Sequence, residues 1–582
     1  MRLKLSSAIL SLVAATTVFA APTPIQLDKR NWLVDQLRPL FTKAINTLEC
    51  GACVAAITGA KNVALINKNW VLDAGRELCP SLAKKPADVC DGMVDLYGHV
   101  LIDVIMKANI SGGDGKILCH SLGGICPAPA IKSGSVNFPK PKPANIAVPA
   151  PSGQLVDVLH LSDWHTDDLY VGGSEADCDK PTCCRKYVDS PLTPTRRAST
   201  WGDYKCDTPQ KLTDDLLKFV PKVANVSFAI MTGDVPPHDI WIQNKESVDR
   251  IEKHAYGEMA ALPAKIYPAV GNHESGPASP HPGFRIISLN TNFCYTVNFY
   301  LYANTAEHDP FNEIKWLVTQ LQAAEDAGER VWIISHVGPS MTDCMQNWSH
   351  LYYQVIQRYS PHVIAEQFFG HSHYDEFALY YGPGAKSAQN AISTGWIGPS
   401  VTPYTDLNPG FRVYKVDSKT WNVFDSQTYI ANLDQSAEWD KTGATPNWHL
   451  EYSAREAYGA YVPIEANEPL SASWWHKVTM AFEKNDAAFQ MYWTFRDKSA
   501  KRSPACAAGG PCPTEMICNM RAGKSADSCT DISIGNHRRD LEEEVQARAL
   551  ADATDPSGMR SLYKRAEPQP WNKKLCGLPF GF

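Results

Sequence analysis

The chain has 582 residues, of which 44% are hydrophobic and 20% are charged, and its formal net charge is −7. This length favours several domains, and the composition is typical of a folded globular protein. The slightly acidic balance and the lack of long Lys and Arg runs argue against a nucleic-acid partner.

The first residues have the pattern of a secretory signal peptide. Arg2 and Lys4 precede the apolar stretch AILSLVAATTVFA, which ends among small residues near Ala20. Such a stretch is short for a membrane span, and a signal anchor is the alternative. We therefore expect residues 1–20 to be a signal peptide. No later stretch is apolar enough to predict a transmembrane span.

The cysteines and sequons also favour export. The chain has 17 cysteines, and disulfides persist in oxidising compartments. Asn-X-Ser/Thr sequons at Asn109, Asn225 and Asn347 are typical of a secreted glycoprotein. We expect a secreted, extracellular monomer, with a vacuolar or lysosomal location as the alternative.

Residues 46–130 contain a cluster of cysteines separated by helical patterns. CGACVAAITGAKNVAL and CDGMVDLYGHVLIDVIMKA carry apolar residues at spacings of three and four, which is typical of helices. Disulfides would close such a small unit, but these cysteines allow many alternative pairings. Residues 131–153 contain prolines every few residues, which predicts an extended, semi-rigid linker.

From residue 154 to about 430, short apolar runs such as VDVLHLSD, FAIMTGD and RVWIISH alternate with helical patterns. Their length and apolar character predict strands buried in a layered α/β structure. Residues 431–530 have helical patterns and further cysteines, and the polar residues 531–582 favour a mobile tail.

Several of the predicted strands end in residue types that bind metals. They are Asp163 and His165 in LHLSDWH, Asp234 in IMTGD, Asn272 and His273 in AVGNHE, His336 in IISH, and His371 and His373 in FFGHSH. Strand ends at one rim of a sheet can bring such side chains together. In an extended segment, residues i and i+2 point to the same side, so DxH and HxH would each present a pair. This set suits two metal ions that share a carboxylate.

The order DxH…GD…GNHE…H…GHxH resembles the calcineurin-like metallophosphoesterase family. The resemblance implies a four-layer sandwich of β-sheets flanked by helices, with a two-metal site. Asp163, His165 and His373 would bind one ion, Asn272, His336 and His371 the other, and Asp234 would bridge them. A metal-bound hydroxide would attack phosphorus, since bound metal lowers the pKa of water to about 7. The ligands suit two zinc ions, with manganese or iron as alternatives.

The departing alkoxide needs a proton, and histidine is the usual donor near neutral pH. His273 lies beside a predicted ligand, and His238 follows the predicted bridging aspartate in GDVPPHDIW. The family resemblance implies that both contact phosphate or act as the catalytic acid. A structural histidine in a proline-rich turn is the alternative for His238.

The order of cysteine-rich helices, proline linker, phosphoesterase and helical end resembles the acid sphingomyelinase family. This implies an all-α saposin B-type domain over 46–130, a calcineurin-like domain over 154–430 and a disulfide-stapled helical subdomain over 431–530. It also implies the disulfides Cys50–Cys126, Cys53–Cys119, Cys79–Cys90, Cys178–Cys183, Cys184–Cys206, Cys294–Cys344, Cys506–Cys512 and Cys518–Cys529, which leave Cys576 over.

The resemblance implies a zinc-dependent phosphodiesterase that hydrolyses sphingomyelin to ceramide and phosphocholine. The saposin domain would present the membrane lipid through peripheral contact, or serve only as a helical scaffold. Tyr404 best matches the family's head-group pocket, where an aromatic ring could bind the choline cation, and a structural tyrosine is the alternative. The alternative functions are a phosphodiesterase for another sphingolipid head group or for nucleotides, and a non-catalytic lipid-binding homologue.

The chain departs from that family after the GNHE motif. It passes through SGPASPHPGF and soon reaches RIISLN, where the family carries a longer insert with a helix and a further strand. The predicted metal ligands are all retained. We expect the shorter segment to open one wall of the substrate pocket and to expose a sheet edge.

Overall fold

The computed structural model describes residues 29–121, 125–127, 134–269, 277–304, 308–404, 406–503 and 505–529. Several predicted features lie outside these residues: the signal peptide 1–20, Asn272 and His273 of the GNHE motif, the tail 531–582 and Cys576.

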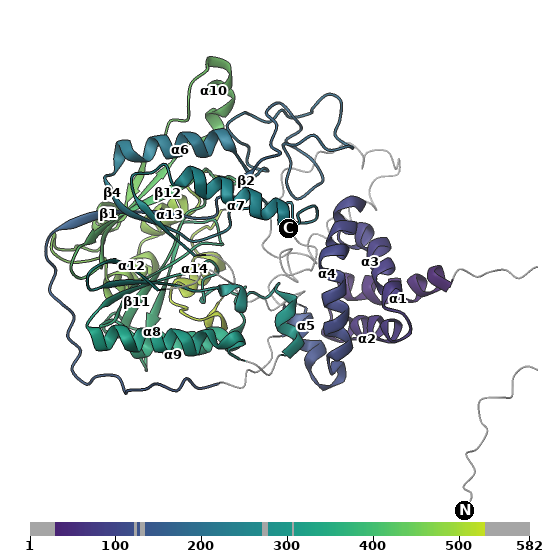
Figure 1. Ribbon diagram of the computed structural model, residues 1–582, viewed down its shortest axis with the longest axis horizontal. Coiled ribbons are helices and arrows are strands. Elements are labelled where there is room, and N and C mark those ends of the chain that lie inside the picture. The colour runs from purple at the N-terminus through teal and green to yellow at the C-terminus, as the bar shows by residue number, and fades with distance from the viewer. Residues whose placement is uncertain are drawn as a thin grey trace, which may run out of the picture.

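The N-terminal part of the chain is a group of helices beside a larger α/β unit (Figure 1). Its helices are α1 (Lys29–Thr47), α2 (Cys50–Ile66), α3 (Lys68–Leu82), α4 (Ala87–Lys107) and α5 (Asp114–Ser121). Apolar residues three and four apart give α2, α3 and α4 buried faces, and disulfides join Cys50 to Cys126, Cys53 to Cys119, and Cys79 to Cys90. The predicted all-α N-terminal unit is confirmed.

Two six-stranded sheets form the centre of the larger unit. The first has the order β14-β13-β12-β1-β4-β5 and contains β1 (Leu155–Leu161), β4 (Val226–Met231), β5 (Lys265–Pro268), β12 (Gly410–Asp417), β13 (Val423–Ile430) and β14 (His449–Ser453). The second has the order β10-β11-β9-β8-β7-β6 and contains β6 (Pro277–His281), β7 (Phe284–Ser288), β8 (Arg330–Ile334), β9 (Ile364–Phe369), β10 (Glu376–Tyr381) and β11 (Ala391–Ile397).

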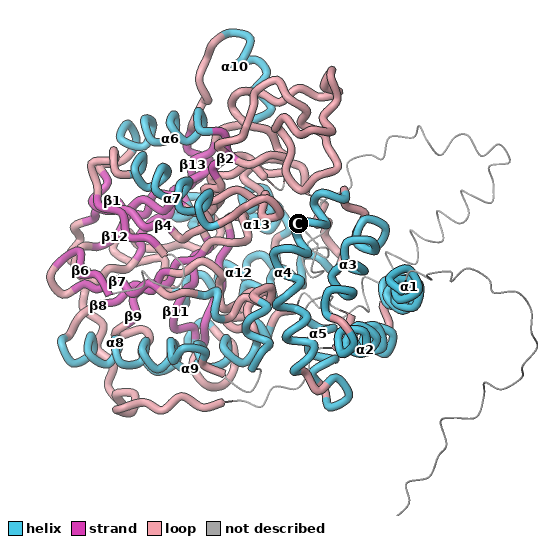
Figure 2. The backbone as a smooth tube through the Cα atoms, turned by 45° about the vertical axis from the view of Figure 1, so that its right-hand side comes forward, coloured by secondary structure: helices cyan, strands magenta, loops and turns pink. Residues whose placement is uncertain are grey.

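Helices cover the outer faces of the sheets, so the larger unit has four layers (Figures 1 and 2). Helices α6 (Gln210–Val223) and α7 (Lys245–Met259) pack on the first sheet, and α8 (Glu313–Ala327) and α9 (Gln346–Tyr359) pack on the second. Between the sheets lies a core that includes Phe228, Trp332, Phe368 and Tyr414. The predicted layered α/β sandwich is confirmed.

The C-terminal region adds helices and one strand to this sandwich. Its helices are α10 (Ser436–Thr442), α11 (Ala454–Gly459), α12 (Ala472–Lys484), α13 (Asp486–Arg496) and α14 (Pro511–Met520). Helix α12 contacts β10 and β11, and α14 contacts β10. The expectation that residues 431–530 are only helical is wrong for β14, which pairs antiparallel with β13. Backbone pairing with β13 outweighs the helical pattern of the surrounding sequence in this short segment.

The prolines of the predicted linker do not leave it detached from the sandwich. The Val136 N–H donates to Gln354 Oε1 at 3.1 Å, and Lys142 Nζ donates to the Gln357 and Ser360 carbonyls at 2.8 and 2.7 Å. At its end, the Ser152 N–H donates to Asp417 Oδ2 at 2.7 Å. Residues 134–153 therefore form an extended strap along the larger α/β unit.

The segment that follows the GNHE motif forms the edge of the second sheet. β6 pairs only with β7 in the strand order, and it carries Pro280. Proline has no N–H to donate and is typical of edge strands, where it blocks pairing with another chain.

Candidate metal centre

Strand direction brings the predicted ligands together. β1 and β4 are parallel neighbours in the first sheet, and β8 and β9 are parallel neighbours in the second. The carboxyl ends of parallel strands lie at one rim, and each of these four strands leads into a predicted ligand. The candidate site therefore lies where this rim of one sheet meets that of the other.

The backbone at the ligands is not extended. Left-handed φ values occur at Asp163 (50°), His165 (40°), Asp234 (57°), His371 (73°) and His373 (66°). The expectation that DxH and HxH face one side as extended segments is therefore wrong, although both pairs do face the site. Non-glycine residues with positive φ are strained and persist where the surrounding structure holds them, often at functional sites.

The first group of ligands surrounds the buried Asp163. His373 Nε2 lies 3.5 Å from Asp163 Oδ1, and His165 Nε2 lies 3.6 Å from Asp234 Oδ2. Asp163, His165 and Asp234 each place a ligand atom within 4.8 Å of the others. Burial lowers the pKa of His165 to about 4 and that of His373 well below its usual range, so both rings are neutral and can offer a lone pair.

The second group contains Asp234, His336 and His371, whose ligand atoms also lie within 4.8 Å of one another. His336 Nε2 lies 3.0 Å from Asp234 Oδ2 and 3.2 Å from His371 Nδ1. Desolvation opposes ionisation of Asp234, but its side chain is 44% exposed, and His336, with His165 and His371, holds the Asp234 pKa well below its usual range. Asp234 lies between the two groups, as a bridging ligand must.

The donor set fits two metal ions. His165 donates from Nδ1 to the Pro236 carbonyl at 2.7 Å, while its Nε2 is buried and has no hydrogen-bond partner within the described residues. A buried nitrogen lone pair without a partner is costly, and a metal ion at this position would satisfy it. The nitrogen and carboxylate ligands suit zinc and related divalent ions.

His238, the predicted acid, lies against the first group. Its ring stacks on His165 with centroids 3.9 Å apart, and its Nδ1 lies 2.5 Å from Asp207 Oδ1. The His238 N–H also donates to Asp207 Oδ2 at 2.9 Å. Burial lowers the pKa of His238, but the Asp207 carboxylate outweighs burial and the net shift is upward. The Asp207 carboxylate therefore favours the protonated form of the His238 ring.

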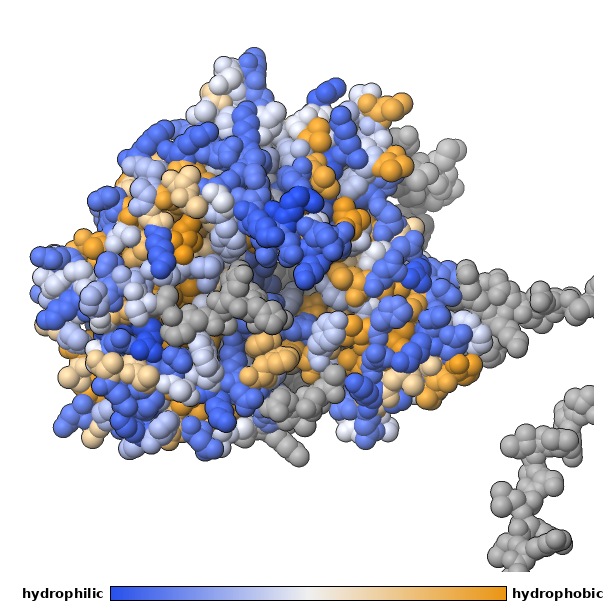
Figure 3. Space-filling view, in the orientation of Figure 1, coloured by the Kyte–Doolittle hydropathy of each residue, from blue (hydrophilic) through white to orange (hydrophobic). Residues whose placement is uncertain are grey.

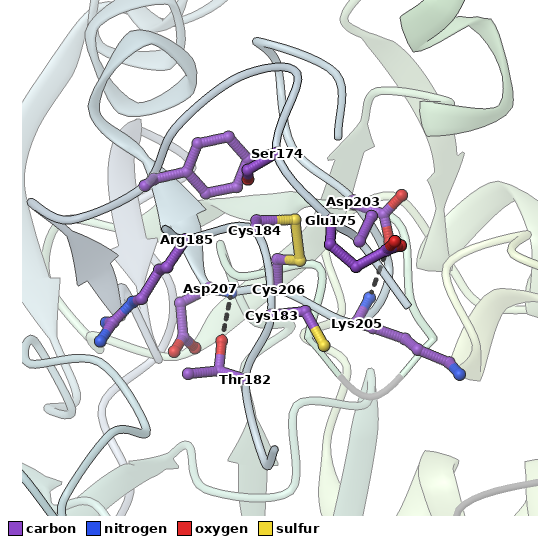
Figure 4. The surroundings of a disulfide bond; sticks show 12 residues. Ser174, Glu175, Thr182, Cys183, Cys184, Arg185, Asp203, Lys205, Cys206 and Asp207 are labelled. Carbon is purple, nitrogen blue, oxygen red and sulfur yellow. Dashed lines mark hydrogen bonds between the residues drawn. A yellow bond between two sulfur atoms is a disulfide. The ribbon is translucent and has the colours of Figure 1, made fainter. Parts of the chain in front are cut away.

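Asp207 was not among the residues predicted from the sequence. It follows Cys206, whose disulfide to Cys184 closes the cysteine-rich loop, residues 168–207 between β2 (Thr166–Asp167) and β3 (Thr208–Pro209) (Figure 4). The Asp207 N–H donates to Thr182 Oγ1 at 3.3 Å, which Figure 4 shows beside the disulfide. The signal available in the sequence was its position next to a cysteine in that loop.

Arg185 is a second residue that the sequence did not single out. Its guanidinium donates to Asp167 Oδ2 at 2.7 Å and to Asp239 Oδ2 at 2.5 Å, and all three side chains are buried. Asp239 directly follows His238. Arg185 therefore connects the cysteine-rich loop to the loop that carries the candidate acid.

The loop of His238 also contacts the N-terminal helices. Trp241 is buried against Val89 and Met93 of α4. A Cβ atom on Gly92 would clash with the Trp241 backbone. Lys180 adds an ion pair to Asp88 at the start of α4, with Nζ 2.7 Å from the carboxylate.

Other predicted residues have the following places. Tyr404 is buried, with its ring centroid 4.2 Å from that of His238. Asn109 and Asn225 are exposed, and Asn347 is half-buried. Disulfides join Cys178 to Cys183, Cys294 to Cys344, Cys506 to Cys512, and Cys518 to Cys529.

Comparison with known proteins identifies relatives along most of the chain. Residues 156–375 match the family model described as calcineurin-like phosphoesterase. Sphingomyelin phosphodiesterase B of Dictyostelium discoideum is 32% identical, over 71% of this chain and 72% of its own. The sphingomyelin phosphodiesterase of Bos taurus is 32% identical, over 87% of each chain. That of Homo sapiens is 33% identical, over 85% of this chain and 84% of its own.

Among the residues that the structure describes, none of the helices combines the length and apolar character needed to cross a bilayer.

Proposed function

Because the chain belongs to the sphingomyelin phosphodiesterase family and carries a calcineurin-like phosphoesterase domain, we propose that it hydrolyses sphingomyelin to ceramide and phosphocholine. Membership makes it a phosphodiester hydrolase with a two-metal centre. The observation that carries the proposal is the convergence of two ligand groups on Asp234 beside His238.

Zinc is the proposed metal. Asp163, His165 and His373 would hold one ion, and His336 and His371 would hold the other with Asn272, which lies outside the described residues. Asp234 would contribute to both. Two bound zinc ions would polarise the phosphodiester and lower the pKa of a water molecule.

The chain's own residues would supply the proton for the leaving group. Asp207 holds His238 through Nδ1, so the other ring nitrogen is left to face the site. The raised pKa of His238 keeps the ring protonated at mildly acidic pH, where it can donate to the departing ceramide oxygen. His273, outside the described residues, would share this role. Tyr404, packed on His238, is the proposed contact for the choline head group.

The N-terminal helices would present the lipid as a saposin domain. Leu65 and Ile66 of α2 are 63% and 68% exposed, and Leu96 of α4 is 44% exposed. Figure 3 shows apolar side chains gathered on this side of the molecule, over the N-terminal helices. Large exposed apolar side chains favour contact with a membrane surface. We therefore propose a peripheral enzyme that is secreted or located in an acidic vacuole or lysosome.

The test is zinc-supplemented hydrolysis of sphingomyelin in liposomes at mildly acidic pH. His371→Ala should abolish phosphocholine release, and His449→Ala, which replaces an exposed histidine, should not. If the parent chain releases no phosphocholine but cleaves bis-p-nitrophenyl phosphate, the substrate is another diester. Release that persists in His371→Ala would refute the proposed site.

A further inference from the structure

The ligand histidines differ in what holds their outer ring nitrogen. His165 donates from Nδ1 to the Pro236 carbonyl, His336 to the Thr232 carbonyl at 2.8 Å, and His373 to the Tyr404 carbonyl at 3.4 Å. In each case a backbone oxygen takes the Nδ1 proton. Nε2 is therefore left with the lone pair that a metal requires.

His371 has the opposite orientation. Its Nδ1 faces the second group, 3.2 Å from His336 Nε2, and its Nε2 lies 3.1 Å from Asp343 Oδ2. An ionised carboxylate only accepts hydrogen bonds, so Asp343 places the ring proton on Nε2 and leaves the Nδ1 lone pair for the metal. We propose that Asp343 is a positioning residue that sets the tautomer and ring angle of His371, and through them the affinity of the second metal site.

The structure explains how a half-exposed carboxylate can have this effect. The Asp343 side chain is 43% exposed, but its backbone is held by a second loop. The Thr296 N–H donates to the Asp343 carbonyl at 2.8 Å, and the Met345 N–H donates to the Cys294 carbonyl at 2.6 Å. The Cys294–Cys344 disulfide joins the same two loops directly beside Asp343.

His371 itself is held from two further sides. Its backbone N–H donates to both carboxylate oxygens of Asp163, at 3.0 and 3.1 Å. The Tyr295 ring meets the His371 ring edge-on, with centroids 5.4 Å apart. The fold thus sets the position of the His371 backbone. Asp343 then determines which ring nitrogen of His371 carries the proton and which one faces the second group.

This arrangement makes the two metal sites unequal in their response to mutation. Among the described ligands, only His371 depends on a side chain for its tautomer, since the other three histidines use backbone carbonyls. A substitution at position 343 should therefore weaken one site and spare the other. This inference rests on the proposed metal ligands, but it does not depend on the substrate.

The experiment measures zinc affinity in the full chain. Zinc is removed with a chelator and returned against a competing chromophoric chelator, for the parent, Asp343→Asn, Asp343→Ala and a control. The control, Asp326→Asn, replaces a similarly exposed aspartate that pairs with Lys140 away from the site. We expect one of the two zinc equivalents to lose about 10–100-fold in affinity in the two Asp343 variants, as is typical when the outer partner of a ligand is removed. The other equivalent, and both equivalents of the control, should keep the affinity of the parent.

A second measurement reports the tautomer. Nitrogen-15 NMR of histidine-labelled, zinc-free protein should show His371 protonated at Nε2 in the parent, and a mixture of tautomers in Asp343→Ala. Wild-type affinity at both sites, or equal loss at both, would overturn the inference, as would an unchanged His371 tautomer. A parent chain that binds two zinc ions but does not hydrolyse sphingomyelin would refute the proposed function and leave the inference about Asp343 intact.

Discussion

Glu313, the first residue of α8, should make stability fall as pH rises. Its side chain is 7% exposed, and Oε1 accepts a hydrogen bond from the Asn290 N–H at 2.7 Å. Burial is the main reason that the pKa of Glu313 rises from 4.5 to about 8. In the unfolded chain the carboxyl ionises first, so folding becomes less favourable between these two pKa values as pH increases.

The magnitude follows from the two pKa values. At about 1.4 kcal/mol per pKa unit, the full difference costs about 5 kcal/mol once pH exceeds the folded pKa. Near neutral pH the loss is about 3 kcal/mol, and at about pH 5 it is below about 1 kcal/mol. Glu313→Gln keeps an acceptor for the Asn290 N–H and cannot ionise. It should therefore exceed the parent in stability by these amounts at neutral pH and match it in acid.

Urea unfolding of the zinc-loaded chain, followed by tryptophan fluorescence from acidic to mildly alkaline pH, measures this difference. Subtracting the two curves removes the titration of all other groups. A pH-independent offset would show that glutamine changed only the packing. Coincident curves at every pH would refute the argument that burial raises the Glu313 pKa.

Further predictions concern the candidate acid, the interface with α4 and the metals. Asp207→Asn removes the carboxylate that raises the His238 pKa. The alkaline limb of the pH profile of kcat, measured on bis-p-nitrophenyl phosphate, should therefore move to lower pH. An unchanged alkaline limb would contradict the role of His238 as the acid. Gly92→Leu places a side chain against the Trp241 backbone and should destabilise the docked helices by about 1–3 kcal/mol, seen as faster proteolysis of the N-terminal unit. Gly51→Leu, where a Cβ meets nothing within 4 Å, is the control, and equal proteolysis of the two variants would argue against the interface. Chelation should lower the melting temperature, and returned zinc should restore it. At a thousandfold excess over Kd, one bound zinc ion should add about 4 kcal/mol to the free energy of unfolding. A melting temperature insensitive to zinc would refute the metal centre.

The layered sandwich could be predicted because its strands are short apolar runs, and such runs carry their own structural signal. The convergence of the described candidate ligands could be predicted for a related reason, since they follow strands and parallel strands end at one rim. The backbone conformation at the candidate ligands could not be predicted. Alternation along an extended chain is a rule for regular strands, whereas Asp163 and His371 have left-handed backbones that the tertiary structure imposes.

Asp207 and Asp343, which hydrogen-bond to the candidate acid and to a candidate ligand, could not be predicted from the sequence. Asp207 bonds to a histidine 31 residues away, and Asp343 to one 28 residues away. Neither belongs to a periodic pattern or a metal-binding motif. Both follow from loops that disulfides bring to the rim, and which loops meet is a property of the folded chain. β14 was not predicted for a similar reason, because its five residues alone do not determine that it pairs with β13.

The strap formed by residues 134–153 limits how far the N-terminal unit can move. Because Gly134 is already held by Gln354, only eight residue steps separate it from Cys126, which is bonded to α2. Fully extended, these steps span at most about 28 Å. If α4 leaves Trp241, its effective concentration at the larger α/β unit stays on the order of 10 mM. Release of the helices would thus be brief and local, and a contact of only modest affinity would suffice to return them.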